Sequence, residues 1–176
     1  NVGIEVARGD FVAFTDDDCL VAPAWITELV SGMSSVEIAA CGGYQTSPDD
    51  ETPFGKAVQT FLTTIGFVGN YARETGRKIV ETRHTPTCNV MYRKAIVQTV
   101  GGFNPNLWPG EDVDVDRRIA RLGNKLVFNP RTVVSHYRPR SFRALRRMMV
   151  AYGEAQAFLM MLHGPFRFLH IAPFIT

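Results

Sequence analysis

The fold is decided by the stretch Phe11-Val12-Ala13-Phe14-Thr15-Asp16-Asp17-Asp18. Four apolar residues typical of a strand end in three consecutive carboxylates, and Pro23 and Trp25 then open a helix. In an open α/β sheet, ligands bind just outside the carboxyl ends of the strands. Three acids at that place repel one another unless a cation lies among them, and a hard divalent cation can also hold phosphate oxygens. The stretch therefore predicts a metal-assisted site for a phosphate or a sugar nucleotide.

Within this acidic run, Asp16 and Asp18 are the expected ligands. Side chains of an extended backbone alternate in direction, so these two project to the same side and Asp17 is turned away. The alternative interpretation is that an aspartate here caps the next helix or fills a turn. Pro23 lies too far along the chain for Asp16 to cap its helix, which favours the metal interpretation.

A second acidic cluster, Glu111-Asp112-Val113-Asp114-Val115-Asp116, begins a predicted helix. The helix dipole favours acids in a first turn, and this alone could explain them. Asp112 lies three and seven residues before the apolar Val115 and Ile119, which predicts that it faces inward at the open end of the helix. Asp114 is expected outside, paired with an arginine of the next turn. An inward carboxylate kept ionised by nearby N–H groups suits a general base.

Two further places could contact a ligand. His136 follows an apolar strand expected at 132–135, and Arg138 and Arg140 come next. A single histidine after a strand is more often structural, but this position also suits a contact to a metal or a phosphate, with Arg140 on the phosphate. Trp108 stands in the loop before the acidic cluster. It is either a platform for a sugar ring or a plug of the core.

Strands alternate with helices along the chain, which favours an α/β layered domain. Strands are expected at residues 11–14, 36–41, 87–92, 125–128 and 132–135, with Gly42-Gly43 ending the second and Asn129-Pro130 as a turn between the last two. Helices are expected at 2–8, 23–33, 54–69, 93–100, 111–122 and 141–162, and an irregular loop at 69–86. Ser141 is the expected N-cap of the last helix.

The chain has 176 residues, about the size of one domain, and its 45% hydrophobic and 20% charged content is that of an ordinary globular protein. Charge is unevenly distributed. Residues 1–135 carry 13 Lys or Arg and 16 Asp or Glu, a net charge of −3, whereas residues 136–176 carry 6 Arg and 1 Glu, a net charge of +5. We expect a main domain at 1–140 and a basic, apolar helical segment at 141–176. This segment either meets phosphates or an anionic membrane surface, or presents a solvated helix face.

Cysteine usage indicates neither a structural zinc site nor a disulfide framework. Cys19, Cys41 and Cys88 are odd in number, widely spaced and form no CxxC pair. A reducing compartment is the simpler assumption, so the chain is expected in the cytoplasm, peripheral to the inner face of a membrane.

Taken in order, these motifs resemble an inverting family 2 glycosyltransferase of the GT-A fold. The resemblance covers residues 1 to about 153. The matching motifs are Asn1-x-Gly3, Ala7-Arg8-Gly9-Asp10, Phe11–Asp18, Pro23-x-Trp25, Asn89-Val90-Met91-Tyr92-Arg93-Lys94, Val100-Gly101-Gly102-Phe103, Gly110-Glu111-Asp112 and the late His136. The resemblance implies a Rossmann-like mixed sheet flanked by helices, typical of nucleotide-diphospho-sugar transferases. The usual first strand–helix–strand unit would lie before Asn1.

The resemblance also implies roles for site residues. Asp16 and Asp18 would hold the ribose and the metal-bound diphosphate of a nucleotide sugar, with Mg²⁺ or Mn²⁺ as the cation. Asp112 would deprotonate the acceptor hydroxyl, and Glu111 would position the acceptor. His136 would be a ligand of the metal or the diphosphate. The expected partners are a nucleotide-sugar donor and a saccharide or lipid-linked acceptor, and no nucleic acid is expected.

Two other classes of protein place acids after strands. A metal-dependent nucleotidyltransferase or phosphohydrolase would act on a nucleotide without a sugar acceptor. A non-catalytic binding module would keep the fold and lack the donor pocket. Metal-dependent binding of nucleotide sugars separates both from a glycosyltransferase.

Overall fold

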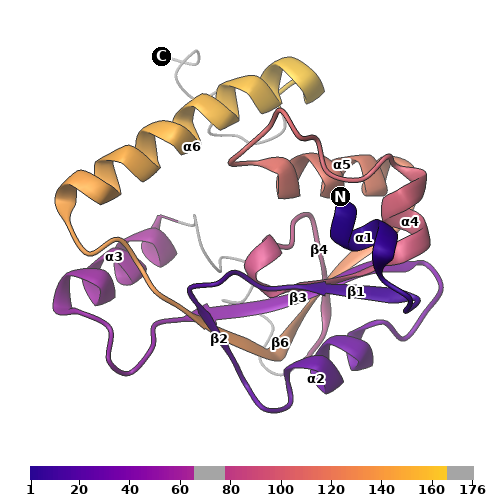
Figure 1. The fold of residues 1–176 in the computed structure, drawn as a ribbon, viewed down its shortest axis with the longest axis horizontal. Helices are drawn as coiled ribbons and strands as arrows, with labels where there is room; N and C mark the ends of the chain where they lie inside the picture. Colours follow the sequence, from indigo (N-terminus) through magenta and orange to yellow (C-terminus); the bar gives the residue numbers. More distant parts are fainter. Residues whose placement is uncertain (66–77, 166–176) are drawn as a thin grey trace.

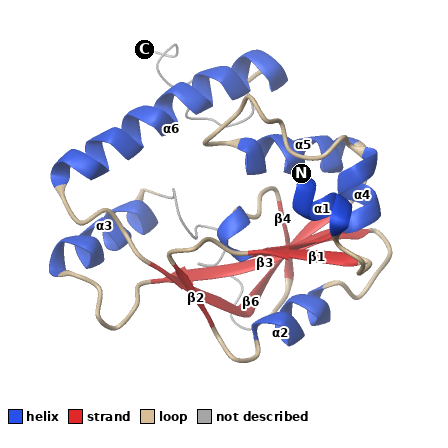
Figure 2. Ribbon diagram, in the orientation of Figure 1, coloured by secondary structure: helices blue, strands red, loops and turns tan. Residues whose placement is uncertain are grey.

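A computed structural model describes residues 1–65 and 78–165, which form a mixed sheet with helices on both faces (Figures 1 and 2). The strands are β1 Phe11–Phe14, β2 Cys19–Val21, β3 Ile38–Thr46, β4 Val80–Thr82, β5 Val90–Arg93 and β6 Lys125–His136. Their order is β1-β5-β3-β6-β2, and β4 also pairs with β6. Among the described strands, β3 and β6 pair in parallel and the other pairs are antiparallel. Because β5 is antiparallel to both β1 and β3, the strands β1, β3 and β6 run in one direction and end at one edge.

The helices are α1 Val2–Val6, α2 Trp25–Gly32, α3 Pro53–Thr64, α4 Lys94–Thr99, α5 Glu111–Arg121 and α6 Phe142–His163. Side-chain caps fix the starts of two of them. The Thr52 hydroxyl accepts a hydrogen bond from the Gly55 N–H at 3.0 Å, and the Ser141 hydroxyl accepts one from the Ala144 N–H at 3.2 Å. The prediction of Ser141 as an N-cap is therefore confirmed. Residues 66–69 of the helix expected at 54–69 lie outside the described residues.

Alternate residues of the strands fill two separate cores, one on each face of the sheet. The first core packs α1, α4 and α5 against the sheet and contains Ile4, Ala39, Ala40, Val90, Tyr92, Val97, Val115, Ile119 and Leu126. The second packs α2 against the opposite face and contains Trp25, Leu29, Met33, Ile38, Cys41, Met91, Val127 and Val134. The layered α/β class expected from the sequence is thus observed.

Gly42 and Gly43 do not end a strand, and the predicted end of β3 at this point is wrong. β3 continues through both glycines to Thr46. A Cβ atom on Gly43 would lie 1.7 Å from the Thr132 hydroxyl, and one on Gly42 would lie 2.8 Å from the Asn89 carbonyl oxygen. The two glycines therefore allow neighbouring backbone to approach β3 closely, which is a common use of glycine inside strands.

The predicted turn at Asn129-Pro130 is instead a bulge within the single strand β6. Gly42 pairs with Phe128 and Tyr44 with Val133, so three extra residues of β6 stand opposite Gly43. The bulge is held by a bond from the Thr132 hydroxyl to the Asn129 carbonyl oxygen at 2.8 Å. The loop expected at 69–86 is also partly wrong, because β4 pairs with the first half of β6. Residues 69–77 of that loop lie outside the described residues.

α6 packs across the amino end of α5. Leu159 of α6 forms a small core with Leu107 and Val113. Gly110, at φ 106°, has the left-handed backbone that glycine tolerates, and a Cβ there would meet Leu159 at 3.2 Å. Among the described helices, none combines the length and apolar content that crossing a bilayer requires.

We predict that Gly43→Ala destabilises the protein by about 3 kcal/mol, because the added methyl group overlaps the backbone and side chain of Thr132. Urea unfolding measures the loss. Gly153→Ala is the matched control: it lies on the exposed side of α6 with nothing within 4 Å of the added Cβ, and should stabilise by about 0.5–1 kcal/mol. Equal effects of the two substitutions would contradict the close approach at the bulge.

Candidate functional site

The candidate site lies at the edge where β1, β3 and β6 end. Asp16 follows β1, Gln45 lies near the end of β3, and His136 ends β6. The short 3₁₀ helix Thr87–Asn89 leads into the antiparallel β5 and brings Cys88 to the same edge. Ligand atoms of Asp16, Cys19, Cys88 and His136 all lie within 4.8 Å of one another. This is the edge at which α/β sheets bind ligands.

A turn, and not an extended run, brings Asp16 and Asp18 to this edge. The Cys19 N–H donates to the Asp16 carbonyl oxygen at 3.2 Å, and Cys19 then pairs with His136 as β2 begins. The extended geometry expected from alternation is therefore wrong. Asp18 reaches the site because its Oδ1 lies 3.1 Å from Nε2 of His136. The structure thus brings together the three predicted metal ligands, Asp16, Asp18 and His136.

Negative charge accumulates around Asp16. Partial burial, followed by the charges of Asp18, Asp112 and Asp17, raises the pKa of the Asp16 carboxyl above its usual range. Burial and the neighbouring carboxylates thus both disfavour the ionised form of Asp16. A divalent cation at this place would remove the conflict, and oxygen and imidazole ligands suit such an ion.

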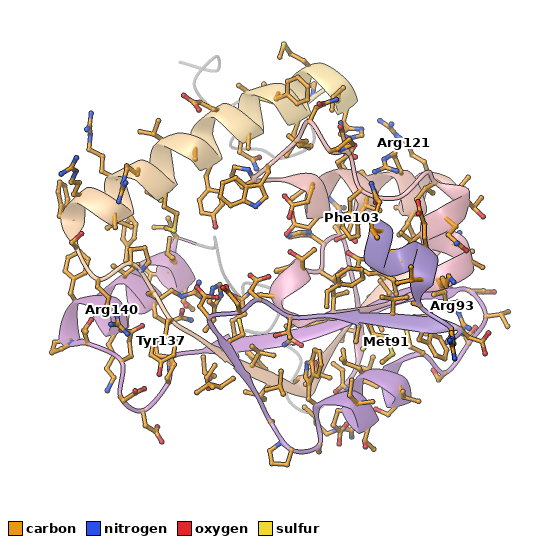
Figure 3. The ribbon with its side chains drawn as sticks, in the orientation of Figure 1. Met91, Arg93, Phe103, Arg121, Tyr137 and Arg140 are labelled. Atoms are coloured by element: carbon orange, nitrogen blue, oxygen red, sulfur yellow. The ribbon has the colours of Figure 1, made fainter. Side chains whose placement is uncertain are left out.

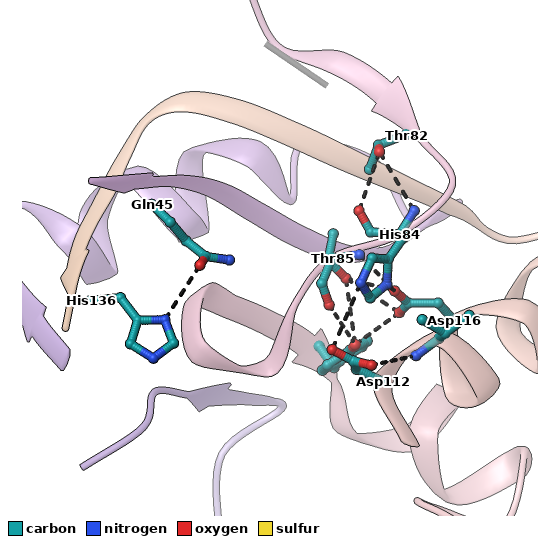
Figure 4. A network of polar contacts seen from close by, with 9 residues as sticks. Gln45, Thr82, His84, Thr85, Asp112, Asp116 and His136 are labelled. Atoms are coloured by element: carbon teal, nitrogen blue, oxygen red, sulfur yellow. Dashed lines mark hydrogen bonds and ion pairs between the residues drawn. The ribbon is translucent and has the colours of Figure 1, made fainter. Parts of the chain in front are cut away.

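His136 is held from behind by a buried arginine. Nδ1 of His136 lies 3.4 Å from Gln45 Oε1 and 3.4 Å from a guanidinium nitrogen of Arg138 (Figure 4 shows the contact to Gln45). Burial, followed by the charge of Arg138, lowers the pKa of His136. With Nδ1 turned toward Gln45 and Arg138, Nε2 is the ring nitrogen that faces Asp18 and the site. A neutral imidazole is the form of histidine that binds metals.

Of the two arginines after His136, the structure buries Arg138 and exposes Arg140. Arg138 is 8% exposed and donates to Gln59 Oε1 at 2.5 Å and to Gln45 Oε1 at 2.9 Å. Arg140 lies with its guanidinium 5.6 Å from the ring centre of Tyr137 (Figure 3). The sequence analysis selected Arg140 for the phosphate, and its role remains a prediction. Arg138 was named beside Arg140 but not selected, because sequence spacing does not distinguish a buried arginine from an exposed one.

Asp112 and Glu111 stand at the open amino end of α5. Asp112 Oδ1 accepts the Val113 N–H at 2.7 Å, and its side chain is 18% exposed. Burial, followed by the charge of Asp112, raises the pKa of Glu111. Glu111 Oε2 is buried and has no hydrogen-bond partner among residues 1–65 and 78–165. A buried acceptor of this kind is ready to receive a hydroxyl donor.

Asp114 was expected on the outside of α5, but the structure buries it. It is 3% exposed, and its carboxylate lies 2.6 Å from Arg118 Nη2 and 2.8 Å from Nε2 of His163. The predicted pairing with an arginine of the next turn is confirmed. The position is buried because α6 covers this side of α5.

A histidine–aspartate pair behind Asp112 was missed entirely. Nδ1 of His84 lies 2.9 Å from Asp116 Oδ2, and Nε2 of the same ring lies 3.7 Å from Asp112 Oδ2 (Figure 4). Asp116 is fully buried and also accepts bonds from the Thr85 N–H at 2.6 Å and from the Tyr92 hydroxyl at 2.8 Å. The sequence did indicate that Asp116 lies beside Asp112, because the two are four residues apart and share a helix face.

Two further aromatic residues, Trp108 and Tyr152, differ in their exposure. Trp108 is 84% exposed, so the alternative in which it plugs the core is wrong. Tyr152 belongs to α6, and burial followed by the charge of Asp112 raises its pKa.

The cysteines also behave differently from the expectation based on spacing. Cys19 and Cys88 are 69 positions apart in sequence, yet both thiols join the cluster with Asp16 and His136. Cys41 lies in the core below α2, where burial raises the pKa of its thiol to about 12. The three cysteines are free.

Comparison with known proteins gives one family. The model of the family described as "glycosyltransferase like family 2" matches residues 1–153. The chain is 24% identical over 164 residues to the pre-mycofactocin glycosyltransferase of Mycobacterium tuberculosis, covering 93% of this chain and 34% of that protein. It is 25% identical over 151 residues to the glucosyl-dolichyl phosphate glucuronosyltransferase of Haloferax volcanii, covering 76% of this chain and 45% of that protein. The chain thus spans about a third to a half of the length of these relatives.

A solved structure agrees with the fold. The mannosyltransferase PcManGT of Pyrobaculum calidifontis, in complex with GDP-Man and Mn²⁺, superposes with a TM-score of 0.62 at 17% identity, covering 98% of this chain and 45% of that chain. The mixed sheet flanked by helices is that of the GT-A glycosyltransferases, as the sequence motifs indicated.

We predict that Arg138→Gln destabilises the protein by about 2–3 kcal/mol, because it leaves the half-buried amide oxygens of Gln45 and Gln59 without the charged donor that the buried Arg138 supplies. Thermal and urea unfolding measure the change. The control is Arg140→Gln, an exposed position at which the same chemical change should alter stability by less than about 0.5 kcal/mol. Equal effects would show that Arg138 is not the arginine that supports the site.

Proposed function

The chain belongs to the glycosyltransferase like family 2, and we propose on this basis that it forms part of an inverting glycosyltransferase. The proposed reaction transfers a sugar from a nucleotide-diphosphate donor to an acceptor hydroxyl. The observation that carries the proposal is the placement of Asp16, Asp18 and His136 at the sheet edge, with Asp112 facing them from α5. The relatives are longer than this chain, which covers 34% and 45% of two of them. The activity of a whole protein is therefore proposed here from the part that this chain represents.

The donor side of the site fits a divalent cation such as Mn²⁺ or Mg²⁺. Asp16 and Asp18 supply carboxylate oxygens, and His136 supplies a neutral ring nitrogen. When bound, the cation would neutralise the charge that develops on the departing diphosphate. Similarity to a mannosyltransferase in complex with GDP-Man and Mn²⁺ supports this choice. Arg140, exposed beside Tyr137, is our candidate for a further phosphate contact.

The acceptor side of the site is the amino end of α5. Asp112 is held by the Val113 N–H and has a partly exposed carboxylate, as a general base requires. The buried Glu111 Oε2 would accept a hydroxyl of the acceptor and fix its orientation. Attack by the activated hydroxyl on the face opposite the diphosphate inverts the anomeric carbon in one step. A second carboxylate nucleophile is then unnecessary.

The exposed start of α6 suggests where an acceptor is delivered. Arg143, Arg146 and Arg147 are exposed there, together with Phe142, which is 72% exposed. Basic and aromatic side chains on one helix end favour an anionic lipid surface. We therefore propose a lipid-linked acceptor, in line with the name of the Haloferax volcanii relative.

We predict that Asp112→Asn in the full-length protein lowers sugar transfer by at least about a hundredfold while Mn²⁺-dependent donor binding is retained, because only the base is removed. Initial rates and calorimetry with Mn²⁺ and a panel of nucleotide sugars measure the two effects. The matched variant Asp18→Asn should show the opposite pattern, in which Mn²⁺-dependent donor binding is the first of the two activities to be lost. Full transfer by Asp112→Asn would contradict the base assignment.

The same experiments separate the rival functions. A nucleotidyltransferase or phosphohydrolase would consume the nucleotide at the same rate without a sugar acceptor. A non-catalytic module would show no metal-dependent binding of any nucleotide sugar. Either result would replace the proposed function.

For the membrane, we predict that Arg146→Glu combined with Arg147→Glu weakens binding to anionic phospholipid vesicles by at least about tenfold, since each arginine near such a surface contributes about 1 kcal/mol. Co-sedimentation with vesicles measures it. Arg121→Glu, an exposed arginine at the end of α5, is the control and should change little. Binding that is indifferent to anionic lipid would contradict the proposed docking.

A further inference from the structure

We propose that His84 and Asp116 form a proton relay behind Asp112. Asp112 takes the proton of the acceptor hydroxyl, passes it to Nε2 of His84, and Asp116 stabilises the imidazolium that results. The proposal rests on the proposed function and adds to it two residues outside the family motifs named above.

The geometry places the His84 ring between two carboxylates. Its Nδ1 lies 2.9 Å from Asp116 and its Nε2 lies 3.7 Å from Asp112 (Figure 4). When Nδ1 carries the proton and donates it to Asp116, Nε2 presents a lone pair to Asp112. The separation of 3.7 Å is longer than a hydrogen bond, and contacts of this kind often shorten when substrate binds.

Asp116 is built to hold the ring in this orientation. It is fully buried, and the Thr85 N–H and the Tyr92 hydroxyl donate to its two oxygens. A carboxylate fixed by several donors has little freedom to turn. Burial raises the pKa of Asp116, and the hydrogen bond from His84 opposes that shift, so the ring N–H of His84 stabilises the buried carboxylate. The arrangement parallels the buried aspartate that orients histidine in hydrolase triads.

The loop before the site fixes the backbone of His84. The Thr82 hydroxyl donates to the His84 carbonyl oxygen at 3.2 Å, and Thr85 bonds to Asp116 through both its N–H and its hydroxyl. His84 is only 13% exposed. These contacts fix the backbone on both sides of His84.

The proposed step balances in protons and electrons. The acceptor O–H bond breaks, and the electron pair of the oxygen forms the bond to the anomeric carbon. The bond from that carbon to the diphosphate oxygen breaks, and its electron pair leaves with the diphosphate. The proton moves from the hydroxyl to Asp112 and then to Nε2 of His84, so Asp112 returns to its carboxylate form. Water removes the proton from His84 after product release.

The relay makes transfer sensitive to pH. Within the described residues 1–65 and 78–165, Asp112 and Asp116 of α5 face His84, and Tyr92 of β5 lies behind Asp116. A His84 that is protonated before the acceptor binds cannot receive a proton, and it pairs with Asp112. Transfer should therefore decrease as pH falls through the range in which imidazole titrates.

The decisive variant is His84→Asn in the full-length protein. The asparagine side-chain amide can still donate to Asp116, but nothing then reaches Asp112. We expect kcat to fall about a hundredfold, with the donor KM unchanged and the imidazole limb of the pH profile lost. His84→Ala should recover part of the activity when free imidazole is added.

His163→Asn is the matched control, because His163 also pairs with an aspartate of α5 but does not face Asp112. It should keep the rate and the pH profile. NMR titration of the His84 ring gives a readout that needs no activity: its midpoint should fall in Asp112→Asn, since a facing negative charge is removed.

The outcomes separate the relay from the proposed function. A His84→Asn variant with the rate and pH profile of the wild type overturns the relay alone. A His84 midpoint that does not respond to Asp112→Asn also overturns it, whether or not the protein transfers sugar. If the His84 midpoint falls in Asp112→Asn as expected but the wild type transfers no sugar, the proposed function is overturned, and with it the catalytic use of the His84–Asp116 pair.

Discussion

The parallel pairing of β3 with β6 is the constraint on which the site depends. Gly43 has no side chain, so the bulge at Thr132 can lie against β3 while the strands stay paired on both sides of it. With β3 and β6 in this register, β1 runs in the same direction through β5. Asp16, Gln45 and His136 then meet at one edge, although they come from widely separated segments of the chain.

Acidic side chains converge on this edge, and the protein compensates their charge in two different ways. On the closed side, which is the buried cluster of His84 and Asp116, the Asp116 carboxylate has His84 as its partner. On the open side, which is the sheet edge with Asp16 and His136, the charges of Asp18, Asp112 and Asp17 repel the Asp16 carboxylate. Arg138 lies behind His136 there and lowers the pKa of the histidine. The closed side therefore suits the movement of a proton, and the open side suits a cation and a diphosphate.

Much of the fold was predictable, because hydrophobic periodicity reports which residues are buried. β1 and the long helices α5 and α6 follow the periodic pattern closely, and the cap of α6 was recognised from Ser141. In β3 and β6 the errors lie where glycine, asparagine or proline occurs inside a strand, and the short strands β2 and β4 were not predicted. Gly42-Gly43 and Asn129-Pro130 resemble chain reversals locally, but here they allow two strands to pack closely.

The sequence by itself determined the class of fold, the acidic run after β1 and the inward position of Asp112, because these follow from local order and helical spacing. Only the tertiary structure decided which side chains meet. It selected Arg138 over Arg140 to support the site, and it set His84 against Asp116. Such contacts depend on which strands pair and in what register, and a single sequence encodes that pairing only through the packing of the whole domain.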